Sequence, residues 1–120
     1  MESKSILAVD DDPDLLEMIG MVLATEDYRV LTAMNGKEAL EMITREMPSL
    51  ILLDMRMPVM NGWEFAQAFR AQYDDAAPIL VVTAAQDAKV SADQIGAEGY
   101  LAKPFDIEDL IDCVRRYARK

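Results

Sequence analysis

The sequence predicts an α/β protein in which a doubly wound, five-stranded parallel sheet carries helices on both faces. Five short apolar runs alternate along the 120 residues with five segments whose apolar residues recur at helical spacing. The runs at residues 50–53 and 79–82 are apolar on successive positions, as in central strands buried on both faces. No linker interrupts the alternation, so we expect residues 1–120 to form a single domain.

The first predicted unit is a strand at residues 5–10 followed by a helix that begins near Pro13. Proline suits the first turn of a helix, and Asp12 before it is a candidate N-cap. The helix has one apolar stripe, formed by Leu15, Leu16, Ile19, Val22 and Leu23.

The second unit is a strand at residues 30–33 and a helix that stops before Pro48. Asn35 is its candidate N-cap. We expect this helix to bury Ala39, Leu40 and Ile43.

The third strand, at residues 50–54, ends in the carboxylate of Asp54. After a turn at residues 57–60, the pair Asn61 and Glu64 has the spacing of a capping box. The helix that follows is expected to turn Phe65, Ala66 and Phe69 inward.

The last two units begin with strands at residues 79–82, closing at Thr83, and 100–102. Residues 87–95 predict a weak, short helix between them. Asp106 is the candidate N-cap of the final helix. That helix is expected to bury Ile107, Leu110, Ile111 and Val114.

The composition excludes several kinds of function. The net charge of −10 opposes binding to nucleic acid or anionic lipid. The absence of histidine removes Ser/His/Asp and Cys/His sites, and Cys113, the one cysteine, forms no disulfide and is expected to pack as a small apolar residue. No apolar run is long enough to span a bilayer, and the N-terminus lacks signal-peptide features, so we expect a cytoplasmic protein.

Reactive side chains follow four of the five strands. In the common strand order 2-1-3-4-5, these four strands are neighbours, and their carboxyl ends share one edge. The side chains are Asp10, Asp11, Asp54, Thr83 and Lys103, whereas the second strand ends in Ala33 and Met34. Clustered carboxylates repel unless a cation neutralises them, and an all-oxygen site suits Mg²⁺ or Mn²⁺.

Each of these signals has a structural alternative. An acidic triplet is usually a solvated loop or cap, which is why we leave Asp12 out of the metal site. Asp54 could end a strand as a turn former, Thr83 could reflect β-propensity, and Lys103 could be a surface lysine. Their joint placement at the ends of neighbouring strands favours a functional site.

The sequence resembles the receiver domain of two-component response regulators over essentially its whole length, and four segments carry the resemblance. They are ILAVDDDP (6–13), LLDMRMPVMNG (52–62), VVTA (81–84) and GYLAKPF (99–105). The resemblance implies a flavodoxin-like (βα)5 three-layer sandwich. It also implies that Asp54 accepts a phosphoryl group from a histidine kinase or a histidine phosphotransfer protein.

The resemblance also implies roles for the residues around Asp54. Asp10, Asp11, Asp54 and the backbone carbonyl of Arg56 would hold the metal ion. Thr83 and Lys103 would contact the phosphoryl group, Ala84 would leave room for access, and Tyr100 would be an aromatic switch between site and surface.

The chain departs from the family pattern in two places. Asn61 stands where the family often has aspartate, and the segment between Thr83 and Lys103 is a couple of residues shorter than usual. We expect the short segment to remove part of the fourth helix.

Several functions fit these observations. The first is a standalone signalling switch, not an enzyme, that acts on a downstream protein. The alternatives are a receiver from a longer regulator with a DNA-binding or enzymatic output domain, and a pseudo-receiver that is never phosphorylated. A third alternative is a phosphate-ester hydrolase with an aspartyl intermediate.

Overall fold

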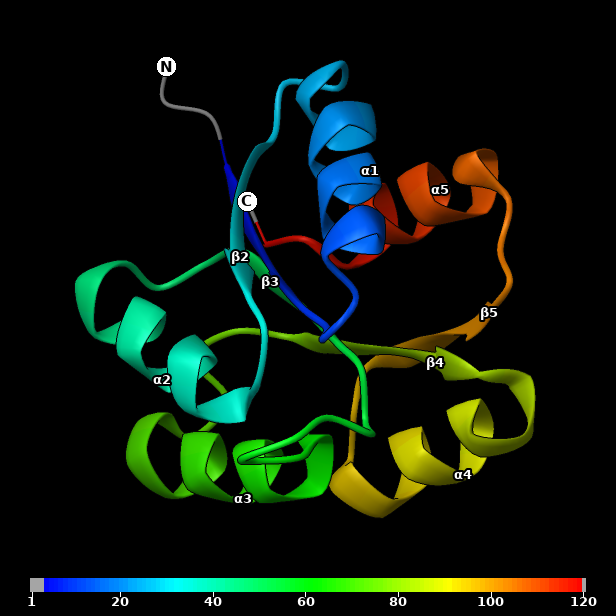
Figure 1. Cartoon of the computed structure of the whole chain (residues 1–120). Helices are drawn as coiled ribbons and strands as arrows, with labels where there is room; N and C mark the ends of the chain where they lie inside the picture. Colours follow the sequence, from blue (N-terminus) through cyan, green and yellow to red (C-terminus); the bar gives the residue numbers. More distant parts are fainter. Residues whose placement is uncertain (1–3, 120) are drawn as a thin grey trace.

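The computed structural model describes residues 4–119 and has the predicted architecture (Figure 1). A parallel sheet has the order β2-β1-β3-β4-β5, which confirms the predicted strand order. The strands are β1 (Ser5–Val9), β2 (Arg29–Ala33), β3 (Leu50–Leu53), β4 (Ile79–Ala84) and β5 (Gly99–Lys103). The helices are α1 (Pro13–Ala24), α2 (Gly36–Arg45), α3 (Gly62–Tyr73), α4 (Ala85–Ile95) and α5 (Ile107–Tyr117). Residues 1–3 and 120, which our single-domain prediction includes, lie outside the described residues.

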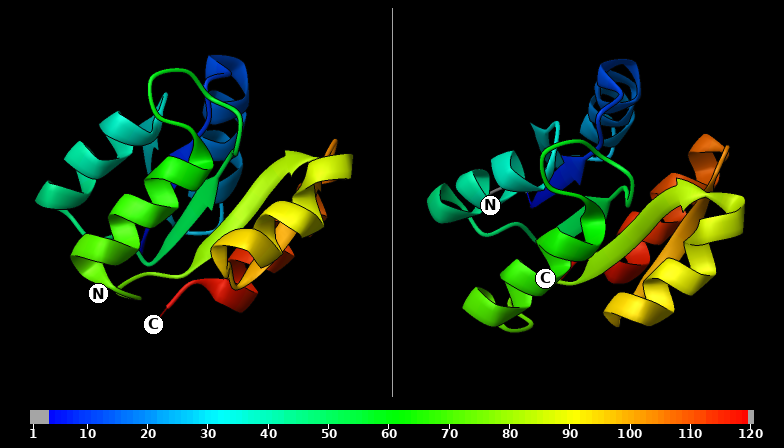
Figure 2. Two further views of the ribbon diagram at one scale, coloured as in Figure 1. Left: turned by 90° about the horizontal axis from the view of Figure 1, so that it is seen from below. Right: turned by 60° about the horizontal axis from the view of Figure 1, so that its bottom comes forward.

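The sheet separates two apolar cores. Helices α1 and α5 cover one face, where Leu16, Leu23 and Leu110 pack against alternate strand residues such as Ile6 and Leu52. Helices α2, α3 and α4 cover the other face, with α3 between its two neighbours (Figure 2). Successive residues of the central strands thus point into different cores, which explains their continuous apolar runs.

Three helix starts confirm the capping predictions. The Asp12 carboxylate accepts hydrogen bonds from the backbone N–H groups of Asp14 and Leu15, and the Asn35 side chain accepts one from Glu38 N. Asn61 and Glu64 form a complete capping box at the start of α3. The Asn61 amide oxygen therefore supplies the cap that aspartate would supply.

Helix α5 differs from the prediction in two respects. Asp106 occupies the N-cap position, but its side chain makes no cap hydrogen bond. Ile107, expected in the core, is 50% exposed, while Leu110 and Val114 are buried. The buried stripe of this helix begins one turn later than the sequence suggested, because Ile107 lies at the rim of the sheet's carboxyl edge.

Helix α4 is longer than the predicted helix at residues 87–95. It has 11 residues and begins at Ala85, immediately after the last residue of β4. No connecting residue therefore separates β4 from α4, and the expected loss of part of the fourth helix relative to the family stays a prediction. The helix ends at Gly96, whose left-handed φ of 65° suits glycine.

None of the helices within residues 4–119 has both the length and the apolar character needed to cross a membrane.

Candidate functional site

Asp10 and Asp54 each follow the last residue of a strand and continue the backbone hydrogen bonds of the sheet by one residue. Asp10 N donates to Ala33 O at 3.0 Å, and Asp54 N donates to Val9 O at 2.9 Å. Strands β1 and β3 are parallel neighbours, so both side chains emerge at the same carboxyl edge. Each carboxylate is buried because the flanking strands and helices close around this edge.

Asp10, Asp11 and Asp54 form an acidic cluster. One carboxylate oxygen of each lies within 4.8 Å of the others, and Asp11 is the exposed member. Within residues 4–119 this is the one such group close enough to share a metal ion. Three convergent carboxylates, two of them buried, fit a divalent cation with oxygen ligands, because the cation offsets their mutual repulsion.

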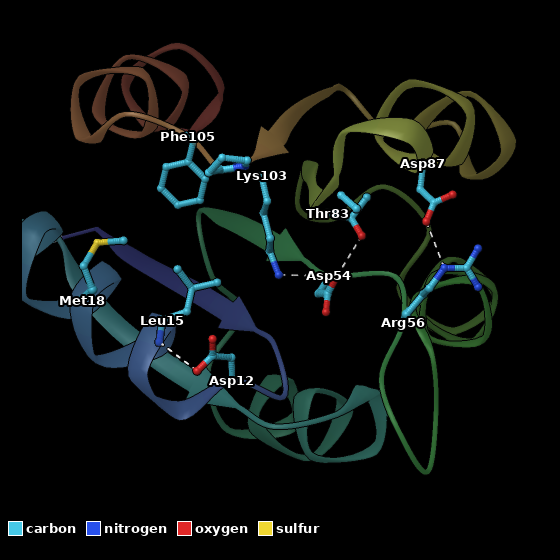
Figure 3. A pocket seen from close by; sticks show the side chains of 11 residues that line it. Asp12, Leu15, Met18, Asp54, Arg56, Thr83, Asp87, Lys103 and Phe105 are labelled. Atoms are coloured by element: carbon cyan, nitrogen blue, oxygen red, sulfur yellow. Dashed lines mark hydrogen bonds and ion pairs between the residues drawn. The ribbon is translucent and has the colours of Figure 1, made fainter.

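Lys103 brings a positive charge to this cluster from the end of β5. Its Nζ lies 2.7 Å from Oδ2 of Asp10 and 3.8 Å from Oδ1 of Asp54 (Figure 3). The lysine therefore forms its shorter contact with Asp10, and the contact with a phosphoryl group that the family resemblance implies stays a prediction.

Asp54 has one oxygen held by two hydrogen bonds. Thr83 Oγ1 and the backbone N–H of Met55 each donate to Oδ1 at 2.9 Å. Oδ2 accepts no hydrogen bond from the described residues. Burial raises the pKa of Asp54, and the charge of Asp10 raises it further, against the opposing effects of Lys103, Thr83 and Met55.

The loop after β3 is held close against the backbone of Asp54. Gly62 N donates to Met55 O at 2.9 Å, and a Cβ at Gly62 would stand 2.8 Å from the Asp54 carbonyl oxygen. Glycine is needed here because no side chain fits that approach. The start of α3 and the position of Asp54 are therefore coupled through backbone contacts.

A cleft of about 630 Å³ opens over Asp54. Thr83, Ala84 and Lys103 line it beside Asp54 (Figure 3). One wall is apolar and is formed by Leu15, Met18, Pro104 and Phe105. The opposite side carries Arg56 and Asp87.

The structure thus brings together five of the predicted site residues: Asp10, Asp11, Asp54, Thr83 and Lys103. Ala84 and Arg56 also line the cleft. Tyr100, the predicted switch residue, lies on β5 with 46% of its surface exposed and does not line the cleft.

An ion pair at the rim of the cleft was not predicted from the sequence. Arg56 Nε donates to Asp87 Oδ2 at 2.9 Å, and the guanidinium lies 5.4 Å from the centre of the Trp63 ring. A signal was available, because Arg56 and Asp87 have opposite charges and follow the ends of two neighbouring strands.

Known proteins are similar to this chain in sequence. Response regulator MprA from Mycobacterium leprae is 40% identical over 117 residues, which cover 96% of this chain and 51% of MprA. Sporulation initiation phosphotransferase F from Bacillus subtilis is 34% identical over 119 residues, which cover 98% of this chain and 95% of the relative. The chain spans about half the length of most of the curated relatives compared with it.

A solved structure shows the same fold. Response regulator protein TrrA from Thermotoga maritima, in complex with Mg²⁺–BeF, superposes with a TM-score of 0.84 at 33% identity, over 95% of this chain and 98% of TrrA. Residues 6–115 match the response regulator receiver domain. These residues include all five strands except the first residue of β1. The chain belongs to the family of response regulator receiver domains.

Proposed function

We propose that Asp54 is the phosphoacceptor of this receiver domain and that its phosphorylation switches a surface that binds a downstream protein. The observation that carries the proposal is the environment of Asp54: a buried carboxylate with one oxygen held by Thr83 and Met55 and one oxygen without a donor. A second carboxylate and an ammonium group lie beside it.

The transfer reaction suits this geometry. A lone pair on the free oxygen of Asp54 attacks the phosphorus of a phosphohistidine on a histidine kinase or histidine phosphotransfer protein. The new O–P bond forms as the P–N bond breaks, and the bonding electrons return to the imidazole nitrogen. Thr83 and the Met55 N–H keep the other oxygen fixed, so the attacking oxygen faces the cleft.

A divalent cation, Mg²⁺ or Mn²⁺, fits the acidic cluster. The side chains of Asp10, Asp11 and Asp54, with the backbone carbonyl of Arg56, are the proposed ligands. When bound, the ion would supply positive charge to the phosphoryl oxygens. TrrA, a relative in fold and sequence, has been solved in complex with Mg²⁺–BeF, which supports this assignment.

Lys103 and Thr83 are the proposed contacts of the transferred group. Lys103 Nζ is already 3.8 Å from Asp54 and has a flexible side chain, so it can move from Asp10 to a phosphoryl oxygen. Thr83 can redirect its hydroxyl proton to the same group, and the small side chain of Ala84 keeps the cleft open. We also propose that Tyr100 changes rotamer when Thr83 moves, since both lie on the paired strands β4 and β5.

The proposal also covers the domain organisation and the cellular location. Residues 1–120 would form a single cytoplasmic receiver that binds no nucleic acid or membrane itself, in line with its charge of −10. The relative of nearly equal length favours a receiver that acts alone on a protein target. The relatives of twice the length favour the alternative, a receiver joined to an output domain.

The test is stoichiometric labelling with a small acyl phosphate and Mg²⁺, measured by intact mass. We expect one phosphoryl group on the wild type and on the control Asp75→Asn, whose side chain is exposed at the far end of α3. Asp54→Asn should remain unlabelled. Labelling of Asp54→Asn to the wild-type extent would remove the central assignment, and continuous turnover of the acyl phosphate by the wild type would favour a hydrolase.

The metal site has a test that needs no phosphoryl donor. Calorimetric titration with Mg²⁺ should show one binding event in the wild type and a loss of affinity of at least about tenfold in Asp10→Asn, because a removed carboxylate costs a direct or water-mediated ligand. Equal affinity in the two proteins would show that the acidic cluster is not the metal site.

A further inference from the structure

The rim of the cleft contains a charge pair that joins two elements beside Asp54. Arg56 follows β3 by three residues, and Asp87 lies in the first turn of α4. The Arg56 side chain is 68% exposed and that of Asp87 only 19%. The arginine can therefore leave the pair for another anion nearby, while the aspartate is held in place on its helix.

Arg56 follows Asp54 by two residues, so its charge is carried close to the proposed acceptor carboxylate. Both members of the pair line the same cleft as Asp54 (Figure 3). A change of charge at Asp54 thus acts on Arg56 and Asp87 in opposite directions.

The Arg56–Asp87 pair links the first turn of α4 to the loop after β3. The helix has no side-chain cap, since Ala84 occupies the N-cap position. Its buried face consists of Ala88, Ser91 and Ala92, and the Ser91 hydroxyl is buried without a hydrogen-bond partner among the described residues. Small side chains bury little apolar area, and an unsatisfied hydroxyl is costly, so α4 packs weakly on the sheet. A single ion pair can therefore affect the position of its first turn.

We propose that Arg56 is an additional phosphoryl-binding residue and that it stays paired with Asp87 until Asp54 is phosphorylated. Conversion of the carboxylate to an acyl phosphate adds about one negative charge at Asp54. The added charge attracts the Arg56 guanidinium and repels Asp87. Arg56 then exchanges its partner on α4 for the phosphoryl oxygens, and the first turn of α4 loses its link to the loop after β3. This inference rests on the proposed function.

Trp63 provides a reporter of the exchange. It is the single tryptophan of the chain, and the Arg56 guanidinium lies against its ring. Its indole N–H donates to Gln94 Oε1 at 2.8 Å, which fixes the ring independently of Arg56. Departure of the cation should therefore alter Trp63 emission without displacement of the ring.

The first experiment measures Trp63 emission with Mg²⁺ present, before and after addition of beryllofluoride as a phosphoryl mimic. We expect a change in the wild type and in Asp93→Asn, and little change in Arg56→Gln. Asp93 is a matched control because it pairs with Lys89 on the exposed side of the same helix. An equal change in Arg56→Gln would overturn the proposal.

The second experiment is a double-mutant cycle on the labelling rate with acyl phosphate. Asp87→Asn should speed labelling about threefold, the scale of a partly exposed ion pair, because it releases Arg56 in advance. In an Arg56→Gln background the same change should have little effect. An equal acceleration in both backgrounds would mean that Asp87 acts only by repelling the donor, and would also overturn the proposal.

Failure of the proposed function gives a different result. If Asp54 is not the acceptor, intact mass shows no label, or a label that survives Asp54→Asn. If Asp54 is the acceptor but Arg56 plays no part, labelling proceeds normally, and the emission change and the rates do not depend on Arg56.

Discussion

Helices α3 and α4 both begin beside Asp54, but the chain secures them very differently. Helix α3 starts with a complete capping box and buries Phe65, Ala66 and Phe69. Helix α4 starts without a side-chain cap and buries two alanines and a serine. The two phenylalanine rings of α3 stack at 5.8 Å between centroids, whereas the buried face of α4 contains no aromatic side chain.

The difference suits the two helices to separate roles beside Asp54. Because Gly62 packs on the backbone of Asp54, a firmly held α3 keeps Asp54 in one position. Because α4 carries Asp87 and begins two residues after Thr83, a weakly held α4 can respond to a charge placed on Asp54. The proposed function needs both properties, a fixed nucleophile and an element of low local stability.

The largest expected effect lies in the core of α3. Phe69 is fully buried, so Phe69→Ala should lower the free energy of unfolding by about 3–5 kcal/mol. Val90→Ala on the exposed side of α4 should change it by less than about 0.5 kcal/mol. Urea denaturation measures both. A similar loss of unfolding free energy at the two positions would contradict the difference between the two helices.

The capping box provides a smaller difference. Asn61→Ala should cost about 1 kcal/mol, because the backbone N–H of Glu64 loses its acceptor. The matched control is Asp106→Ala, at an N-cap position whose side chain makes no cap hydrogen bond. Equal costs in thermal unfolding would show that the Asn61 hydrogen bond contributes nothing specific.

The buried Asp54 carboxylate should lower the free energy of unfolding at neutral pH. Burial and the Asp10 charge raise the pKa of Asp54, so the folded state binds this proton more tightly than the unfolded chain does. The free energy of unfolding then falls as the pH rises from about 4 through the raised pKa. Without metal, Asp54→Asn should therefore raise the free energy of unfolding at pH 7 and raise Tm.

Thermal scans with a chelator, at a series of pH values, test this expectation. The gain from Asp54→Asn should shrink as the pH approaches the ordinary range of a carboxyl group, where the wild-type side chain is also neutral. A gain that grew toward low pH would contradict the assigned direction of the pKa shift.

The smallest expected effect concerns the buried face of α4. Ser91→Ala removes a hydroxyl that has no hydrogen-bond partner within residues 4–119, so it should raise the free energy of unfolding by about 0.5–1 kcal/mol. If the proposed role of α4 is right, the more stable helix should also show a smaller Trp63 response to beryllofluoride. Destabilisation by Ser91→Ala would mean that the hydroxyl has a partner in solution.

Much of this fold follows from local sequence. The alternating patterns, Asp12 before Pro13 and the Asn61–Glu64 spacing encode strands, helices and caps through interactions within a few residues. The convergence of Asp10, Asp54, Thr83 and Lys103 also follows, because parallel strands in a known order place their carboxyl ends together.

Other features depend on contacts that no local pattern contains. The start of α4 at Ala85 is set by packing of the helix on the sheet, which overrides the absence of a capping residue. The exposure of Ile107 depends on where the sheet ends. Lys103 lies nearest Asp10, and Arg56 pairs with Asp87, because long side chains select among several anions at distances that only the assembled edge defines.

The most direct measurement of the central claim is to locate the acyl phosphate chemically. Borohydride reduces an aspartyl phosphate to homoserine, and peptide mass spectrometry then identifies the position. We expect homoserine at position 54 and at no other aspartate after treatment with acyl phosphate and Mg²⁺. Homoserine at position 10 or 11, or its absence from a protein that carries the label, would contradict the role assigned to Asp54.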